Sequence, residues 1–129
     1  MDSIHLHDYE VYRIALATYA EARTVQEKTS VIHLIANRIR SGKFGSDACE
    51  VIFANGQFNG VHDIVNGKHK YPPKKVMLQT QLLVIDTLWH KKYVNQVANS
   101  LYFHDKSIND MSSEWKRKRI TRVDSLIFY

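Results

Sequence analysis

The sequence predicts a single, mostly helical α+β domain with one short β element. Its 129 residues are the usual length of one domain. With 5 Gly and 2 Pro it has few turn-forming residues for a many-stranded sandwich or barrel. Apolar residues at helical spacing fill the chain up to about residue 89, and β-like segments occur only after residue 100. We therefore expect one domain over residues 1–129, with the first seven residues frayed.

The first helix is expected over about residues 8–23, with Asp8 as its N-cap. Spacings of four and three place Ile14, Thr18 and Glu21 on one face of this helix. Glu21 therefore falls in the last turn, on or beside the buried side.

Capping patterns locate the next two helices. Thr24 and Glu27 have the spacing of a capping box, so a second helix starts at once and ends at Ser41-Gly42. Asp47 and Glu50 repeat that spacing and predict a short third helix.

Residues 55–70 are expected to form a loop, because three Asn-Gly pairs are strong turn signals: Asn55-Gly56, Asn59-Gly60 and Asn66-Gly67. Pro72-Pro73 can open another long helix, which runs to about Trp89. Residues 100–104 and 123–129 are typical of short β segments.

The charge balance indicates a polyanionic partner. The chain has 18 Lys and Arg against 13 Asp and Glu, a net charge of +5 with His neutral. Its single Cys excludes a disulfide within the chain and a zinc ribbon. No apolar run approaches the roughly 18 residues that a membrane span needs. The first residues lack an apolar signal core, so we expect synthesis in the cytoplasm without a signal peptide.

The most informative segment is 17–23, which holds Glu21 among Ala and Tyr residues. Burial and the negative end of a helix both favour the neutral form of a carboxyl group there. A carboxylic acid that stays protonated near neutral pH is what a glycosidase needs to protonate a leaving glycosidic oxygen. The structural alternative is an ion pair between Glu21 and Arg23 or a neighbouring Arg.

At this point the sequence resembles the SleB-like cell-wall hydrolases, which include spore-cortex-lytic enzymes and some phage lysins. The resemblance covers about residues 12–129. The matching residues, in order, are Ala17, Tyr19, Glu21-Ala22-Arg23, Asn37-Arg38, Cys49-Glu50-Val51, Gly56-Gln57-Phe58, Leu101-Tyr102-Phe103-His104, Trp115 and Phe128-Tyr129.

The resemblance implies a lysozyme-like fold that cuts the β-1,4 bond between N-acetylmuramic acid and N-acetylglucosamine in peptidoglycan. It assigns the catalytic acid to Glu21, and it favours a lytic transglycosylase, in which one Glu acts as acid and then as base. A muramidase-type hydrolase would need a second carboxylate, at about 5–5.5 Å or 6.5–9.5 Å from the first. The sequence offers Glu27, Asp47, Glu50 and Asp63 for that role, and the resemblance marks none of them as a second catalytic carboxylate.

Four further residues are candidates for binding the glycan. Gln57 and Phe58 follow a turn, where an amide and a ring can meet sugar N-acetyl groups, although Phe58 also suits the core. Tyr102 and His104 alternate with apolar neighbours and share one face of a strand, where they line the groove or serve the fold. Asn37-Arg38 is expected to support the fold, as a buried amide or as a partner of an acidic group.

The sequence departs from the family pattern near these motifs. Ala20 and Thr24 stand where Gly is usual, Asn59-Gly60 replaces an aromatic residue, and Leu126 replaces a His. These departures leave Glu21 in place and affect the groups around it.

Competing functions have weaker support. Seven His show no metal-ligand spacing, and Cys49 suits a core position, so we expect neither a metal nor a cofactor. A basic stretch at 116–119 with Arg122, beside Trp115, suits a nucleic-acid-binding module, but no recognition signature accompanies it. We therefore expect a monomer that acts on peptidoglycan strands, delivered by phage-type release or as a virion component, and that binds no specific nucleic acid.

Overall fold

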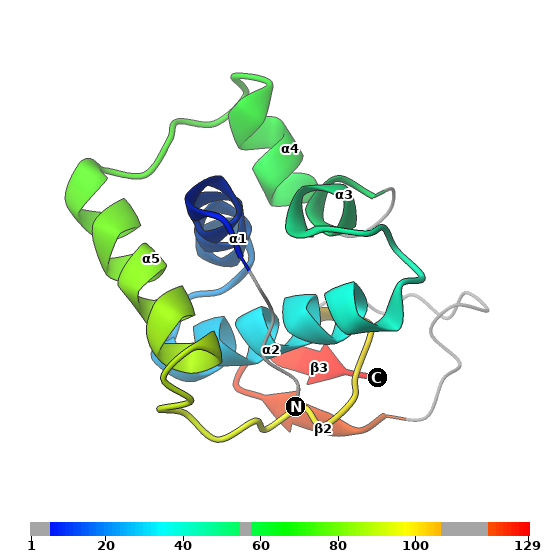
Figure 1. Cartoon of the computed structure of the whole chain (residues 1–129). Coiled ribbons are helices and arrows are strands. Elements are labelled where there is room, and N and C mark those ends of the chain that lie inside the picture. Colours follow the sequence, from blue (N-terminus) through cyan, green and yellow to red (C-terminus); the bar gives the residue numbers. More distant parts are fainter. Residues whose placement is uncertain (1–5, 55–57, 107–118) are drawn as a thin grey trace.

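The computed structural model describes residues 6–54, 58–106 and 119–129. These residues form five helices and three short strands, so the predicted mostly helical α+β class is confirmed (Figure 1). The elements are α1 (Asp8–Glu21), α2 (Val25–Ser41), α3 (Ala48–Phe53), α4 (Asn59–Val65), α5 (Lys74–Leu88), β1 (Phe103–Asp105), β2 (Thr121–Val123) and β3 (Leu126–Phe128).

Helix α1 lies at the centre of the helical part. The other four helices all pack against it, and α2 separates it from the sheet (Figure 1). Four consecutive residues of α1, Ile14 to Ala17, are 0% exposed, because the helix is covered on every side. This position carries the C-terminal turn of α1, and with it Glu21, to the edge of the core.

The ends of α1 differ from the prediction by one or two residues. The N-cap is His7 and not Asp8, and the carboxylate of Glu10 accepts a hydrogen bond from the His7 backbone at 3.1 Å. The helix ends at Glu21 and not at Arg23, because Ala22 takes an extended conformation with φ −131°. This break frees the chain to start α2 almost at once.

The capping patterns of α2 and α3 are confirmed. Thr24 Oγ1 accepts from the Glu27 backbone at 3.1 Å, and the Glu27 carboxylate accepts from the Thr24 backbone at 3.3 Å. Helix α2 ends at Gly42, whose φ of +71° is the left-handed conformation that glycine adopts most easily. Asp47 caps α3 in the expected way, since its side chain accepts from the Glu50 backbone at 2.9 Å.

The segment expected to be one loop, residues 55–70, contains helix α4, so that prediction was wrong. Asn59 and Gly60 form its first turn, where backbone N–H groups have no partner within the helix and glycine is tolerated. Val61 and Ile64, three residues apart, bury one face of this short helix. The turn signal at Asn66-Gly67 is confirmed by the φ of +83° at Gly67, and Asn55-Gly56 lies outside the described residues.

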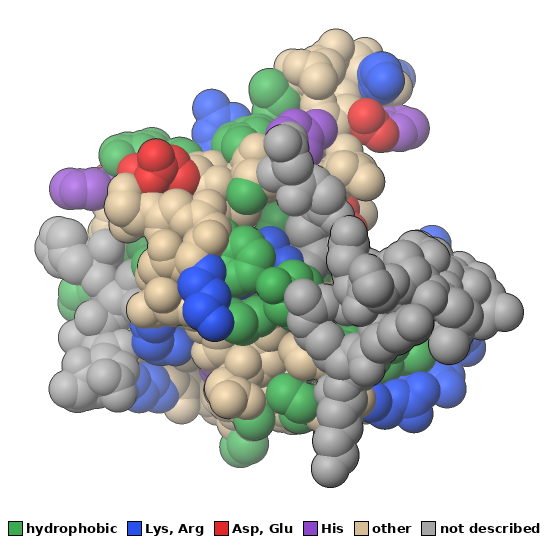
Figure 2. Space-filling model, turned by 90° about the vertical axis from the view of Figure 1, so that its right-hand side faces the viewer, with side chains coloured by type: hydrophobic (Ala, Val, Ile, Leu, Met, Phe, Trp, Pro, Cys, Tyr) green, Lys and Arg blue, Asp and Glu red, His purple; other side chains and the backbone are tan. Residues whose placement is uncertain are grey.

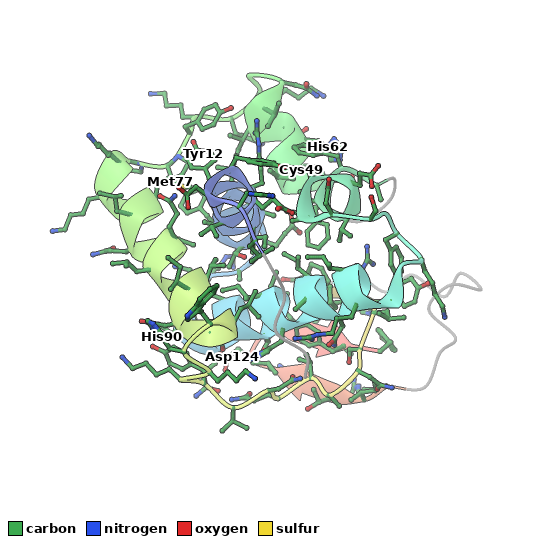
Figure 3. The ribbon with its side chains drawn as sticks, in the orientation of Figure 1. Tyr12, Cys49, His62, Met77, His90 and Asp124 are labelled. Carbon is green, nitrogen blue, oxygen red and sulfur yellow. The ribbon has the colours of Figure 1, made fainter. Side chains whose placement is uncertain are left out.

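Helix α5 covers one side of α1. Met77 and Val84 are buried, and Met77 points from α5 toward α1 (Figure 3). The opposite face exposes four large apolar side chains: Leu78, Leu82, Ile85 and Trp89. Within the described part of the chain, no helix has the length and apolar character needed to cross a membrane.

The three strands form an antiparallel sheet in the order β1-β3-β2. Both predicted β segments contain strands: residues 100–104 overlap β1, and residues 123–129 contain β3 and the last residue of β2. Phe103 of β1 pairs with Phe128 of β3, and both side chains are buried with the ring of Phe58 beside Phe103. The small sheet therefore covers the core from the side opposite α1.

Candidate active site

Glu21 lies where two helices meet. It is the last residue of α1, its side chain is half-buried, and its Oε2 accepts a hydrogen bond from the backbone N–H of Gly60 at 3.1 Å. Gly60 stands in the first turn of α4, so a segment 39 residues away in the sequence holds the carboxyl group. The sequence placed Glu21 in a last helical turn beside the buried side, and the structure confirms that placement.

The surroundings of Glu21 favour its protonated form. Burial raises the pKa of Glu21 above its ordinary value, and the hydrogen bond from Gly60, which lowers the pKa, does not cancel this effect. Among the described residues no Arg or Lys forms an ion pair with Glu21, so the expected structural alternative, a pair with Arg23, is absent there. A carboxyl group whose pKa is raised keeps its proton to higher pH and is suited to donate it.

Gly60 contacts the carboxyl group so closely that the position requires glycine. A Cβ atom at residue 60 would lie 2.7 Å from Glu21 Oε2 and 2.9 Å from the Cβ of Ala20. The sequence indicated only a turn at Asn59-Gly60, so it missed this functional contact. The sequence signal that could have indicated this contact is that Asn59-Gly60 stands where the family pattern has an aromatic residue.

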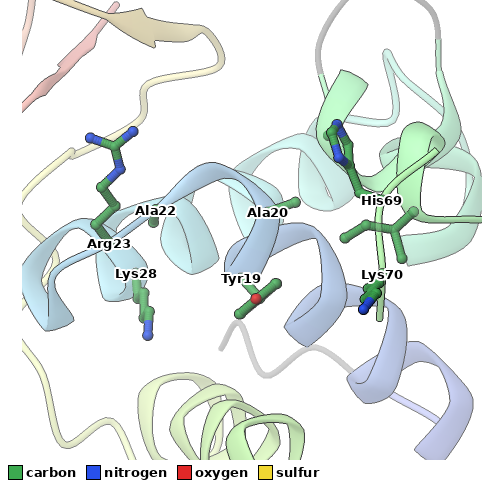
Figure 4. Close-up of a pocket in the computed structure, with 9 residues that line it drawn as sticks. Tyr19, Ala20, Ala22, Arg23, Lys28, His69 and Lys70 are labelled. Atoms are coloured by element: carbon green, nitrogen blue, oxygen red, sulfur yellow. The ribbon is translucent and has the colours of Figure 1, made fainter. Parts of the chain in front are cut away.

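A pocket of about 590 Å³ opens beside Glu21. Ala20 and Ala22, the two chain neighbours of Glu21, line it together with Gly60. Its other lining residues come from α1, the link between α1 and α2, α2, α4 and the segment after α4: Tyr19, Arg23, Lys28, Ile64, His69 and Lys70 (Figure 4). Its size is in the range of small-ligand sites.

The other candidate carboxylates each have a structural role. Glu27 is 2% exposed and accepts hydrogen bonds from three backbone N–H groups and the Ser125 hydroxyl. Asp47 caps α3, and Glu50 accepts from the Ser46 backbone at 2.7 Å. Asp63 Oδ2 lies 3.8 Å from His69 Nε2. None of the four lines the pocket beside Glu21.

Phe58 does not serve as the predicted glycan contact. Its side chain is 0% exposed, and its ring packs 5.7 Å from that of Phe103 and below the guanidinium group of Arg38. An aromatic ring between two core elements has no free face for a sugar, so the core reading of Phe58 is the one the structure bears out. Gln57 lies outside the described residues.

Tyr102 and His104 are half-buried on either side of the buried Phe103, as the alternation predicted. Each packs on other residues of the fold. Tyr102 meets the ring of Phe44 edge-on at 5.8 Å, and His104 Nε2 lies 2.6 Å from the hydroxyl of Tyr129. Neither residue lines the pocket beside Glu21, so their glycan contacts remain a prediction.

Asn37 and Arg38 support the fold as expected. Asn37 donates to the carbonyl groups of Ala98 and Ser100, and Arg38 Nε donates to Leu101 at 2.6 Å. Arg38 is 2% exposed, and burial lowers its pKa to about 10. Its guanidinium group lies over the Phe44 ring at 4.0 Å. Both side chains therefore fasten α2 to the chain that leads into β1.

The described residues hold no group of three or more His, Cys, Asp or Glu side chains that would suit a metal ion. His62 and His90 lie on opposite sides of the molecule (Figure 3). Cys49 is half-buried on α3, and burial raises its pKa, which disfavours a reactive thiolate. Of the basic stretch, only Arg119 and Arg122 are described, and both are exposed; Trp115 and 116–118 lie outside the described residues.

A carboxyl group with a raised pKa, at a helix end beside a pocket, makes Glu21 a candidate general acid. Comparisons with known proteins then define the family. The model of the cell wall hydrolase family matches residues 22–129, beginning one residue after Glu21. The chain therefore belongs to the cell wall hydrolase family.

Two solved structures share the fold. The catalytic domain of the Bacillus cereus SleB protein superposes with a TM-score of 0.74 at 20% identity, covering 96% of this chain and 91% of that one. The catalytic domain of the germination-specific lytic transglycosylase SleB from Bacillus anthracis superposes with a TM-score of 0.72 at 22% identity, covering 95% of both chains. The search of curated proteins finds no significant match. The expected SleB-like fold is confirmed.

Proposed function

We propose that this protein is a lytic transglycosylase that cleaves the β-1,4 bond between N-acetylmuramic acid and N-acetylglucosamine, with Glu21 as its catalytic acid and base. The raised pKa of Glu21, beside a pocket in a cell wall hydrolase, is the observation that carries the proposal. The SleB of Bacillus anthracis, which has the same fold, is described as a lytic transglycosylase.

In the proposed reaction Glu21 first donates its proton to the glycosidic oxygen as the bond to the anomeric carbon breaks. The Glu21 carboxylate then takes the proton of the C6 hydroxyl of the same muramic acid, whose oxygen bonds to that carbon. The products are a 1,6-anhydromuramic end and a free N-acetylglucosamine end, with Glu21 protonated again. The Gly60 N–H stabilises the intermediate carboxylate, since it already donates to Oε2.

The roles of the other carboxylates support a mechanism with one acid. Glu27, Asp47, Glu50 and Asp63 are engaged with backbone groups, Ser side chains or His69. A two-carboxylate hydrolase needs a second such group across the cleaved bond. The C6 hydroxyl of the substrate removes that requirement.

The test is the digestion of purified peptidoglycan sacculi by the wild-type protein and by Glu21→Gln. We expect the substitution to reduce solubilisation by at least about a hundredfold, since general acid catalysis contributes about 10²–10⁴-fold. Circular dichroism verifies that the Glu21→Gln variant is folded. Clearing by Glu21→Gln at the wild-type rate would refute the assignment.

Mass spectrometry of the released muropeptides then decides the reaction. Anhydromuramic ends are the expected product. Reducing muramic ends would identify a hydrolase with the same site, and loss of stem peptides with intact glycan would identify an amidase.

A further inference from the structure

We propose that the pocket beside Glu21 binds carboxylate groups of the peptide stems that muramic acid carries, so that the protein prefers walls with charged stems. This inference rests on the proposed function. We call the pocket the basic pocket; its lining is Tyr19, Ala20, Ala22, Arg23, Lys28, Gly60, Ile64, His69 and Lys70.

The charge of the basic pocket is one-sided. Arg23, Lys28 and Lys70 line it, and the described lining residues include no Asp or Glu, although the Glu21 carboxyl group lies next to the lining on Gly60. Among the described residues, these three side chains have no acidic oxygen within ion-pair distance. Three cations around one concave surface attract an anionic ligand, and a concave surface focuses that attraction. Within the described part of the chain, Asp63 lies 3.8 Å from His69 of the lining, while Arg23, Lys28 and Lys70 remain available to an anionic ligand.

The cations surround the pocket instead of sharing one edge. Figure 4 shows Arg23 and Lys28 on one side and His69 and Lys70 on the other, with Tyr19 and Ala20 between them. Ala20, Ala22 and Ile64 add apolar groups to the lining. A lining that combines apolar groups with separated cations matches a ligand with small aliphatic parts and more than one anionic group. A peptide stem of alanines and acidic residues has this chemistry.

The position of the basic pocket agrees with the attachment point of the stem. Ala20 and Ala22 are the chain neighbours of Glu21, and Gly60 contacts both the pocket and the Glu21 carboxyl group. Muramic acid is one of the two sugars at the cleaved bond, and its stem leaves the ring through the lactyl group. A stem on that sugar therefore starts close to Glu21. The volume of about 590 Å³ holds several atoms beyond the lactyl group.

The experiment compares sacculi that differ only in stem charge. Phosphate-containing wall polymers are removed from all sacculi with hydrogen fluoride, and half of the material is then treated with carbodiimide and ammonia, which convert stem carboxylates to amides. We expect the wild type to digest the charged sacculi roughly three- to tenfold faster than the amidated ones, as two or three exposed ion pairs would give. The double variant Lys28→Gln/Lys70→Gln should bring this ratio close to one.

The matched control is Lys74→Gln/Lys75→Gln, which removes the same charge from the exposed start of α5, away from the basic pocket. It should keep the wild-type ratio. Equal wild-type rates on both kinds of sacculi, or an unchanged ratio in Lys28→Gln/Lys70→Gln, would overturn the inference. A further sample that is not treated with hydrogen fluoride keeps its wall phosphates, and a preference for that sample with no effect of amidation would also overturn the inference, because the ligand would then be a wall phosphate.

Binding gives a readout that does not depend on catalysis. Glu21→Gln should sediment with charged sacculi more tightly than with amidated ones, and adding Lys28→Gln/Lys70→Gln should remove the difference. If the wild type digests neither substrate, the proposed function fails, whereas digestion of both at one rate contradicts the stem inference alone.

Discussion

Glu21 depends on a balance between burial, which disfavours its charge, and one hydrogen bond from Gly60, which favours it. Burial prevails, so the folded protein binds a proton at Glu21 more tightly than the unfolded chain does. Two testable consequences concern this pair of residues.

The first consequence is a pH dependence of stability. Because the pKa of Glu21 is higher in the folded protein than its ordinary value of 4.5, its contribution to stability is complete below pH 4.5. That contribution is lost as the pH rises through the folded pKa. We therefore expect Glu21→Gln to gain stability relative to the wild type between pH 4 and pH 8, as measured by thermal unfolding.

Asp8→Asn is a suitable control for this series, since Asp8 is exposed in the first turn of α1, at the other end of the helix from Glu21. A stability difference between Glu21→Gln and the wild type that stays constant from pH 4 to pH 8 would contradict the raised pKa.

The second consequence concerns the absence of a side chain at Gly60. In Gly60→Ala the new methyl group would meet Glu21 Oε2 at 2.7 Å and Ala20 Cβ at 2.9 Å, so the carboxyl group must move. A displacement of about 1 Å can cost roughly a hundredfold in rate. We expect Gly60→Ala to lower kcat on sacculi by about ten- to a hundredfold.

Asn59→Ala serves as the neighbouring control, because Asn59 is exposed in the same helical turn. Wild-type kcat in a folded Gly60→Ala protein would show that Glu21 does not need this position.

At the scale of elements, Glu27 joins the start of α2 to the turn between β2 and β3. Its carboxylate accepts from the backbone of Arg23 at 2.9 Å, from the backbone of Ser125 at 2.8 Å, and from the Ser125 hydroxyl. Thr24 strengthens the same junction, since its hydroxyl donates to Asp124 at 2.5 Å. Thr24, which follows Glu21-Ala22-Arg23, is therefore bonded to the turn between β2 and β3, and this bond helps to fix the position of the C-terminal turn of α1.

Replacing Glu27 should weaken this junction. In Glu27→Gln the side-chain NH₂ group faces N–H groups that need an acceptor. We expect this change to lower the free energy of unfolding by about 2–3 kcal/mol. Burial alone would raise the pKa of Glu27, but hydrogen bonds from Ser125, Arg23 and Thr24 outweigh it and lower the pKa. The contribution of Glu27 is therefore present above pH 4.5 and lost as the pH falls through the lowered value.

Urea unfolding at pH 7 and at pH 3 measures both effects. The difference between wild type and Glu27→Gln should be large at pH 7 and smaller at pH 3, while Glu50→Gln, an exposed change of the same charge, should have less effect at pH 7. Equal unfolding midpoints for wild type and Glu27→Gln at pH 7 would contradict the proposed role of the junction.

At the scale of the whole molecule, the net charge of +5 is distributed and not confined to one region. Figure 2 shows Lys and Arg side chains at several separate places on one face, with acidic groups between them. A distribution of this kind favours general attraction to an anionic wall, while the basic pocket supplies a local preference.

Wall binding should therefore depend on salt. The Debye length falls from about 10 Å at 0.1 M ionic strength to about 3 Å at 1 M, so long-range attraction is screened. We expect Glu21→Gln to sediment with sacculi several-fold less at high salt than at low salt. Binding that persists at 1 M salt would instead indicate apolar adhesion, for which Leu82 and Trp89 on the outer face of α5 are exposed.

The sequence by itself determined the features that rest on local interactions. The caps at Thr24 and Asp47 and the glycine at the end of α2 all follow from residues within one or two helical turns of each other. The position of Glu21 in a last helical turn belongs to this group as well.

Only the tertiary structure decided which distant groups meet. The contact between Glu21 and Gly60 spans 39 residues. Asn59-Gly60, which the sequence indicated as a turn, forms the start of α4. The burial of Phe58 depends on Phe103 in the sheet, and the basic pocket joins residues of α1, α2 and α4. Such encounters arise from the packing of whole elements, and spacing along the chain carries no direct record of them.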